Sequence, residues 1–115
     1  MDSLIQMQEL YEYLSIARKE FKKRGLEYAK AYTNYRKLLA MELLKLKAEG
    51  MPATIVSDIA RGQEEVANAK RIEIETECLY RSCQEAINTY KLQIKVLQEQ
   101  IKNELGGIEW IRYFY

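Results

Sequence analysis

Apolar and aromatic residues recur every three or four positions along two long stretches, and this spacing limits the possible fold more than any other feature. The first stripe consists of Met7, Leu10, Leu14, Ala17, Phe21, Gly25, Tyr28, Tyr32, Tyr35, Leu39, Leu43 and Leu46. The second consists of Ala69, Ile72, Thr76, Leu79, Cys83, Ala86, Ile87, Tyr90, Ile94, Leu97, Ile101 and Leu105. Such spacing places side chains on one helical face, so each stretch predicts one long amphipathic helix.

Helix-breaking residues separate the two stripes. Gly50 suits the position just after a helix, and Pro52 prevents the helix from continuing. Between them and Gly62, the apolar residues Ile55, Val56 and Ile59 give a short segment its own apolar side. We therefore expect helices over roughly 3–49 and 63–105, with a capping segment over 51–62. The stripe keeps its phase across Gly25, which favours a helix that is continuous there; the alternative is a kink or a short break after Lys22-Lys23-Arg24.

Nearly equal helix lengths and a short connection favour antiparallel neighbours. The sequence thus predicts an all-α fold, in which residues 1–105 form a long antiparallel helical hairpin of coiled-coil type. Gly106-Gly107 is expected to end the second helix. The remaining residues, 106–115, form an aromatic tail that we expect to pack on the hairpin or on a partner.

Further apolar residues lie away from the two stripes, and a lone hairpin leaves such residues in water. They predict a second packing surface, most simply a homodimer that forms a four-helix bundle. The alternatives are a monomer covered by the tail and the 51–62 segment, or a different protein partner. The predicted interface residues are Ile5, Ile16, Leu38, Met41, Ile74, Leu92, Val96, Trp110, Tyr113 and Tyr115.

Catalytic and metal-binding patterns are weak. The chain has no histidine, which removes the commonest general base and the usual zinc ligand. The densest carboxylate group, Glu73, Glu75 and Glu77, is interpreted as a solvated acidic face. Cys78 and Cys83 lie five residues apart, too far around a helix to bridge, and are expected to be free thiols. We expect no enzyme activity, no cofactor and no metal.

A basic run on the first helix offers an alternative function. It consists of Arg18, Lys19, Lys22, Lys23 and Arg24. Such a run can hold phosphates by charge, which makes nucleic-acid binding the second hypothesis. The simpler interpretation is an ordinary solvated helix face, and the net charge of +1 gives no argument for polyanion binding.

No stretch of the sequence approaches the about 20 apolar residues that a membrane-spanning helix needs. The first residues, Met1-Asp2-Ser3-Leu4, do not have the pattern of a secretory signal. A cytoplasmic protein without membrane contact is therefore expected.

Two segments carry a resemblance to a known family. Residues 46–62 (LKAEGMPATIVSDIARG) with Glu65-Val66-Ala67, and residues 86–97 (AINTYKLQIKVL) with Gln100-Ile101-Lys102, resemble a small uncharacterised helical family of temperate phages and prophages of Gram-positive bacteria. With the pattern of the first helix, the likeness covers most of residues 20–104, and the tail departs from it.

The resemblance supplies no active site. It implies a phage protein that acts in the host cytoplasm by binding a host protein and modulating or inhibiting it, for example in anti-defence. The alternative that it leaves open is a nucleic-acid-binding accessory factor in phage DNA metabolism.

Overall fold

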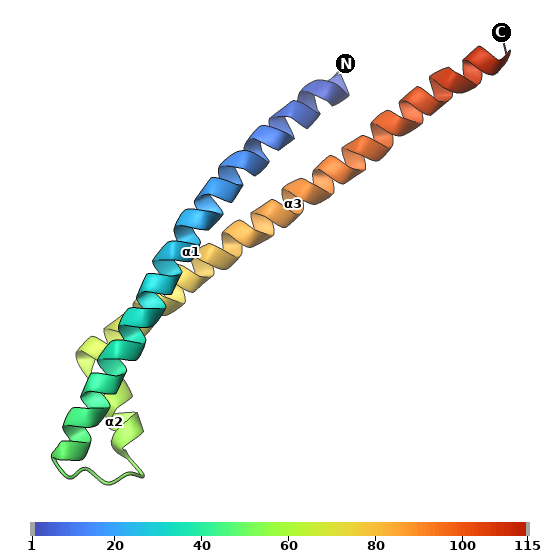
Figure 1. The fold of residues 1–115 in the computed structure, drawn as a ribbon. Coiled ribbons are helices and arrows are strands. Elements are labelled where there is room, and N and C mark those ends of the chain that lie inside the picture. The colour runs from blue at the N-terminus through green and yellow to red at the C-terminus, as the bar shows by residue number, and fades with distance from the viewer. Residues whose placement is uncertain (1, 115) are drawn as a thin grey trace. The chain divides into compact units, whose positions relative to one another are not determined.

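The chain folds into helices only, within the part that the structure describes. The structure is a computed structural model that describes the backbone of residues 2–114 and the side chains of residues 2–106. It contains α1 (Asp2–Ala48), α2 (Val56–Gly62) and α3 (Glu64–Phe114). Because α1 and α3 run in opposite directions (Figure 1), the predicted all-α antiparallel hairpin is confirmed. The helix α1 is continuous through Gly25, as its unbroken stripe predicts.

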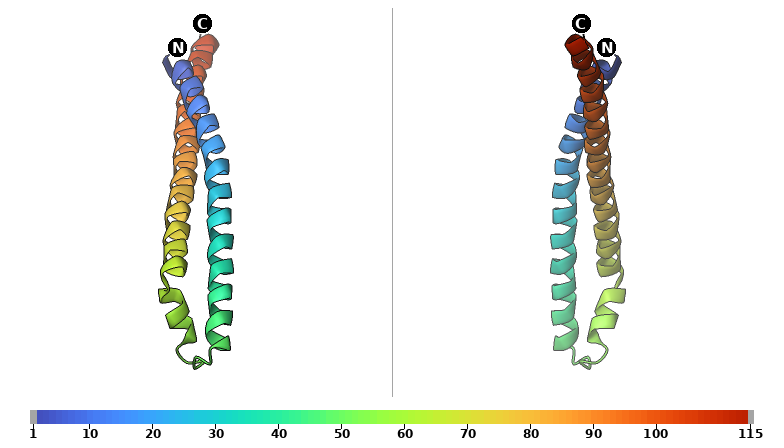
Figure 2. Two further views of the ribbon diagram at one scale, coloured as in Figure 1. Left: turned by 90° about the vertical axis from the view of Figure 1, so that its left-hand side faces the viewer. Right: turned by 90° about the vertical axis from the view of Figure 1, so that its right-hand side faces the viewer.

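Two compact units divide the chain. The terminal unit contains Met1–Phe21 and Cys83–Tyr115, and the loop unit contains Lys22–Ser82. Each unit therefore holds one stretch of α1 and one stretch of α3, and the loop unit also holds α2. Within the loop unit, α2 lies opposite the last turns of α1 and leads into α3 through one short break (Figure 2).

A glycine-centred cap ends α1. Gly50 has a positive φ of 86°. Its backbone N–H donates to the carbonyl of Lys47 at 3.0 Å, and the Met51 N–H donates to the carbonyl of Leu46 at 3.1 Å. These two bonds form a Schellman motif, in which a left-handed residue lets the chain turn back and satisfy the last carbonyls. Met51 and Leu46 also share an apolar cluster, so the cap turns the chain toward the core.

The start of α3 is capped by a side chain. Gln63 is the single non-helical residue between α2 and α3. Its Oε1 accepts a hydrogen bond from the Val66 N–H at 3.2 Å, and its own N–H donates to the Ala60 carbonyl at 3.3 Å. Gln63 thus satisfies a free donor of α3 and a free acceptor of α2, which fixes the junction between them.

We predict opposite effects for two glycine-to-alanine substitutions. Gly50→Ala should destabilise the protein by about 1–2 kcal/mol, because an L-residue is strained at positive φ. Gly62→Ala should instead stabilise it by about 0.4–1 kcal/mol, because Gly62 is helical and has no atom within 4 Å of an added Cβ. Urea denaturation followed by circular dichroism measures both. Equal effects of the two substitutions would contradict the Schellman cap.

Apolar side chains form separate clusters in the two units. In the terminal unit, Leu14 of α1 packs with Ile87 and Ile94 of α3. In the loop unit, one cluster joins Tyr35 to Val66 and Ala69, and a second joins Leu46 to Val56 and Ala60 of α2. These clusters confirm that the two predicted stripes pack against each other near their ends. We call this contact between α1 and α3 within each unit the seam. The clusters also confirm that the 51–62 segment covers the end of α1.

The predicted seam is wrong in the middle of α3. Ile72 and Leu79 are exposed, whereas Glu73 is buried and Tyr80 is half-buried. A Cβ added at Gly25 would lie 3.2 Å from the Tyr80 ring, so the missing side chain at Gly25 makes room for tyrosine. On α1, Tyr32 was predicted in the seam but is exposed, and its neighbour Ala31 is buried. The helices pair here through small and polar residues.

The predicted end of the second helix is also wrong. α3 does not stop at Gly106-Gly107 but continues to Phe114. Glycine lowers helix propensity by about 1 kcal/mol but ends a helix chiefly where it takes a positive φ, and Gly50 is the only described glycine that does so. The backbone of the predicted tail is therefore part of α3, except for Tyr115, which lies outside the described residues.

Candidate protein-interaction site

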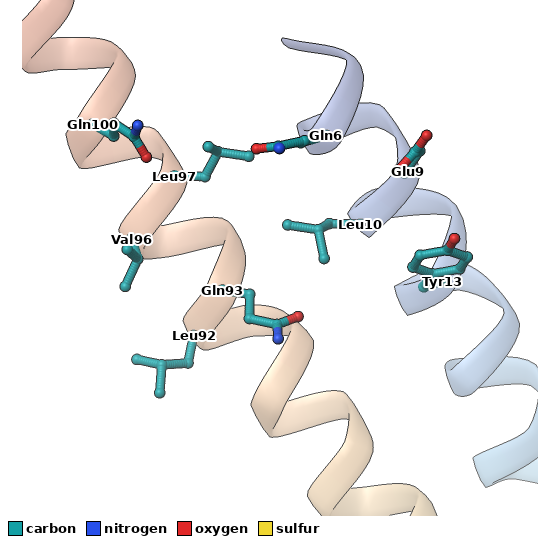
Figure 3. A pocket seen from close by; sticks show the side chains of 9 residues that line it. All are labelled: Gln6, Glu9, Leu10, Tyr13, Leu92, Gln93, Val96, Leu97 and Gln100. Atoms are coloured by element: carbon teal, nitrogen blue, oxygen red, sulfur yellow. The ribbon is translucent and has the colours of Figure 1, made fainter. Parts of the chain in front are cut away.

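The terminal unit contains an apolar groove between α1 and α3. Its volume is about 470 Å³, and α3 contributes Leu92, Gln93, Val96, Leu97 and Gln100. From α1 come Gln6, Glu9, Leu10 and Tyr13. Leu10 and Leu97 extend into the space between the helices, whereas Leu92 and Val96 stand side by side along the outer edge of α3 (Figure 3). We call the surface formed by these nine residues the interaction face.

The walls of this face differ in how firmly they are held. Leu97 is buried and Leu10 packs on the Leu14 cluster, so the floor belongs to the core. The Tyr13 ring lies 5.9 Å from the Tyr90 ring, a distance at which aromatic rings attract each other. By contrast, Leu92 and Val96 are 62% and 60% exposed. A fixed floor with two open aliphatic side chains is suited to receive an apolar side chain from outside.

The charge of the interaction face is low. Glu9 is its single charged residue, and Gln6, Gln93 and Gln100 supply neutral amides. Neutral amides around an apolar centre give the composition of a protein interface, in which charges are depleted at the core. One carboxylate also means that two copies of this face would not repel each other strongly.

The structure places the predicted interface residues unevenly. Ile5, Ile16, Leu92 and Val96 are all exposed in the terminal unit, and Met41 and Ile74 are exposed in the loop unit. Leu38 was predicted to be exposed but is half-buried, because it packs on the cluster of Tyr35, Val66 and Ala69. The side chains of Trp110, Tyr113 and Tyr115 lie outside the described residues.

The α1 wall extends beyond the groove at both ends. Ile5 lies four residues before Glu9, and Ile16 lies three residues after Tyr13, so these residues share one helical face. Sequence reasoning found Ile5 and Ile16 but missed Leu10 and Leu97 as parts of the face. It assigned both leucines only to the stripes that form the seam. That they also line the groove becomes apparent only once α1 is paired with α3.

The basic run is mostly exposed. Arg18 and Lys19 lie in the terminal unit, and Lys22 and Lys23 lie in the loop unit, all with exposed side chains. Arg24 is half-buried and pairs with Glu27 at 3.3 Å. At 100° per residue, Arg24 points well away from Lys22, so the Arg24 guanidinium does not lie on the same side of α1 as the Lys22 ammonium.

The predicted solvated acidic face is wrong for one member. Glu73 is buried in the seam, where its Oε2 accepts a hydrogen bond from Lys70 Nζ at 3.1 Å. Lys70 Nζ also lies 4.7 Å from the centre of the Tyr35 ring, a cation–π distance. Glu75 stays exposed and pairs with Arg71, as a surface carboxylate does. The lysine supplies the partner that a buried carboxylate requires.

Tyr28 faces this acidic part of the seam. Its ring meets the Tyr80 ring edge-on at a centroid distance of 5.9 Å. Partial burial, followed by the negative charges of Glu77 and Glu73, raises the pKa of Tyr28 above its ordinary value of 10.0. The Arg81 charge lowers this pKa but is the weaker influence.

We predict that Tyr28 makes stability fall at alkaline pH. A tyrosine with a raised folded-state pKa favours the native state while it is protonated, and this contribution is lost as pH rises above 10.0 through the folded pKa. Tyr28→Phe should therefore weaken the fall in melting temperature above that pH, and Tyr11→Phe serves as the control. If Tyr28→Phe leaves this fall unchanged, the carboxylates do not act on Tyr28.

The described residues contain neither a cluster of metal ligands nor a membrane-spanning helix. Among them, no group of three histidine, cysteine or carboxylate side chains could hold a metal ion. None of the described helices is long and apolar enough to cross a membrane. Cys78 and Cys83 are both free, the first exposed and the second half-buried.

Comparison with known proteins adds no relative. No protein family, curated protein or solved structure matches this chain. The resemblance to phage proteins therefore rests on the residues quoted above, and the function must be argued from the site itself.

Proposed function

We propose that this chain is a non-enzymatic interaction protein that binds other polypeptides through the interaction face of the terminal unit. The supporting observation is the pair of open aliphatic side chains, Leu92 and Val96, beside a groove whose floor is apolar. Grouped apolar side chains on a protein surface mark interaction sites, and a groove between two helices suits the apolar face of a third helix.

The partner that best fits the interaction face is a second copy of the chain. A two-fold interface brings the same patch together from both copies, which requires a patch that does not repel itself. The interaction face has one carboxylate, Glu9, and presents both a groove and protruding aliphatic side chains. Two terminal units would then bury Leu92 and Val96 in a four-helix bundle. Each buried side chain contributes about 1.5–3 kcal/mol before the cost of association is subtracted.

Photo-cross-linking from Val96 tests this proposal and identifies the occupant. A benzoylphenylalanine placed at position 96 should cross-link, in living cells, to peptides from the interaction face of another copy. Placed at the equally open Leu44 of the loop unit, it should give little product. Equal yields from positions 96 and 44 would remove the interaction face as a specific site.

A narrower proposal follows from the sequence resemblance. The chain would be a phage or prophage protein of the host cytoplasm that binds a host protein and modulates or inhibits it. Recovery of one host protein cross-linked to position 96, and not to position 44, supports this proposal. A cross-linked product that contains only this chain contradicts it and leaves the self-association intact.

A second candidate function is nucleic-acid binding along α1. The observation that favours it is the exposure of Arg18, Lys19, Lys22 and Lys23. A gel shift at low salt with the double variant Lys22→Gln/Lys23→Gln tests it. Binding that weakens in the variant and falls steeply with salt supports this function, and no binding at low salt overturns it.

A further inference from the structure

A second pocket lies in the loop unit and is lined by cations. Its volume is about 500 Å³, and all three helices contribute to it. Tyr35, Arg36 and Leu39 come from α1, Arg61 from α2, and Ala67 and Lys70 from α3. Three positive side chains that are distant in sequence therefore converge on one cavity.

The guanidinium groups of Arg36 and Arg61 are not engaged by other side chains among the described residues, either in an ion pair or in a hydrogen bond. Asp58 lies three residues before Arg61 on α2 but forms no such pair with it. Within the described residues the lining contains no carboxylate, and Glu73, which is not part of the lining, pairs with Lys70. Three lining cations, one of them paired with Glu73, leave the pocket with a surplus of positive charge.

The identities of the cations favour phosphate. A guanidinium offers a planar fork of donors that matches the oxygens of a phosphate, and an ammonium adds a point charge. Lys70 Nζ lies 3.1 Å from Glu73 Oε2 and 4.7 Å from the centre of the Tyr35 ring, and the Lys70 side chain is 48% exposed. The two guanidinium groups and the ammonium line the same pocket, so all three are available to a phosphate bound there.

The apolar residues that line the rest of the pocket suit a phosphate that carries an organic group. Leu39, Ala67 and the buried Tyr35 give the pocket an apolar side. A volume of about 500 Å³ falls in the range of small-molecule sites, which combine apolar walls with a few placed polar groups. A concave site of this size suits a small molecule better than the extended backbone of a nucleic acid.

We infer that the pocket of Arg36, Arg61 and Lys70 binds a small organic phosphate, with the phosphate on the three cations and its organic part on Leu39 and Ala67. This site is separate from the interaction face, because all of its residues lie in the loop unit. The inference is independent of the proposed function.

Calorimetric titration of the full chain with adenosine monophosphate at low salt tests the inference, with inorganic phosphate and adenosine as comparisons. We expect adenosine monophosphate to bind more tightly than phosphate, and adenosine not to bind. Arg36→Gln and Arg61→Gln should each weaken binding by about tenfold or more, since each removes a charge-assisted contact. Lys91→Gln removes one exposed charge from the terminal unit and should leave binding unchanged.

Several results would overturn the inference. One is no heat of binding with any phosphate up to about 10 mM, a concentration that reveals even weak sites. Others are equal binding of adenosine and its monophosphate, or binding that both arginine variants retain while circular dichroism shows them folded. Binding of duplex DNA without binding of the mononucleotide would assign the cations to a nucleic acid instead.

Discussion

Replacing Val66 by aspartate is expected to unfold the loop unit, with a loss of about 3–5 kcal/mol in the free energy of unfolding. Val66 of α3 is 2% exposed and packs in one cluster with Tyr35 of α1 and Ala69 of its own helix. A carboxylate placed there would lose its hydration, and Lys70, one helical turn later, is already paired with Glu73. Burying an uncompensated charge is among the costliest single changes in a protein. Circular dichroism at 222 nm during thermal unfolding measures the effect as a fall in melting temperature.

Asn68→Asp is the matched control for this substitution. It adds the same charge two residues away at an exposed position, where the Asn68 Oδ1 already accepts a hydrogen bond from Arg71 at 2.7 Å. We expect a change within about 0.5 kcal/mol, as for other surface substitutions. If the two variants melt alike, Val66 is not in the core of the loop unit.

The second large effect concerns association. The double substitution Leu92→Glu/Val96→Glu should weaken self-association at least about 100-fold, because it removes two aliphatic groups and places four carboxylates at one two-fold interface. The helical content should not change, because both positions are exposed in the single chain and glutamate favours helix. Concentration-dependent light scattering measures the loss.

A second double variant separates the interaction face from a general effect of charge. Leu26→Glu/Leu44→Glu adds the same two carboxylates per chain at positions in the loop unit that are 69% and 70% exposed. It should leave association unchanged within about twofold, because neither residue belongs to the interaction face. Equal losses in both double variants would mean that charge alone, and not Leu92 and Val96, controls association.

Sequence reasoning succeeds where a single residue type decides the backbone. Gly50 and Pro52 fix the end of α1, because one tolerates a positive φ and the other cannot donate within a helix. The outer parts of the seam, such as Leu14 and Ile94, are equally predictable, because apolar residues at helical spacing have no competing position nearby.

The middle of the seam was not predictable from spacing alone. Between Ala69 and Cys83, the positions of Ile72 and Leu79 and those of Glu73 and Tyr80 both fit steps of three and four residues. The stripe rule prefers the apolar pair, but Gly25 leaves room for the Tyr80 ring and Lys70 compensates Glu73. The space that Gly25 leaves for the Tyr80 ring appears only once the opposite helix is in place, whereas the Lys70–Glu73 pair lies within α3 itself.

The two candidate sites differ in the same way. Exposure of Leu92 and Val96 could be predicted, because both lie off the stripe of their own helix. The phosphate pocket could not, because Arg36, Arg61 and Lys70 come from three helices and no local motif links them. Their convergence follows from the fold of the loop unit.

Sedimentation velocity of the unmodified chain over a range of concentrations tests the central claim most directly. An interaction face that binds its own copy predicts a species of twice the 13.6 kDa chain mass, which grows with concentration at tens of micromolar. The same species should be missing in Leu92→Glu/Val96→Glu. A single 13.6 kDa species at every concentration, unchanged by that double substitution, would contradict self-association through this face.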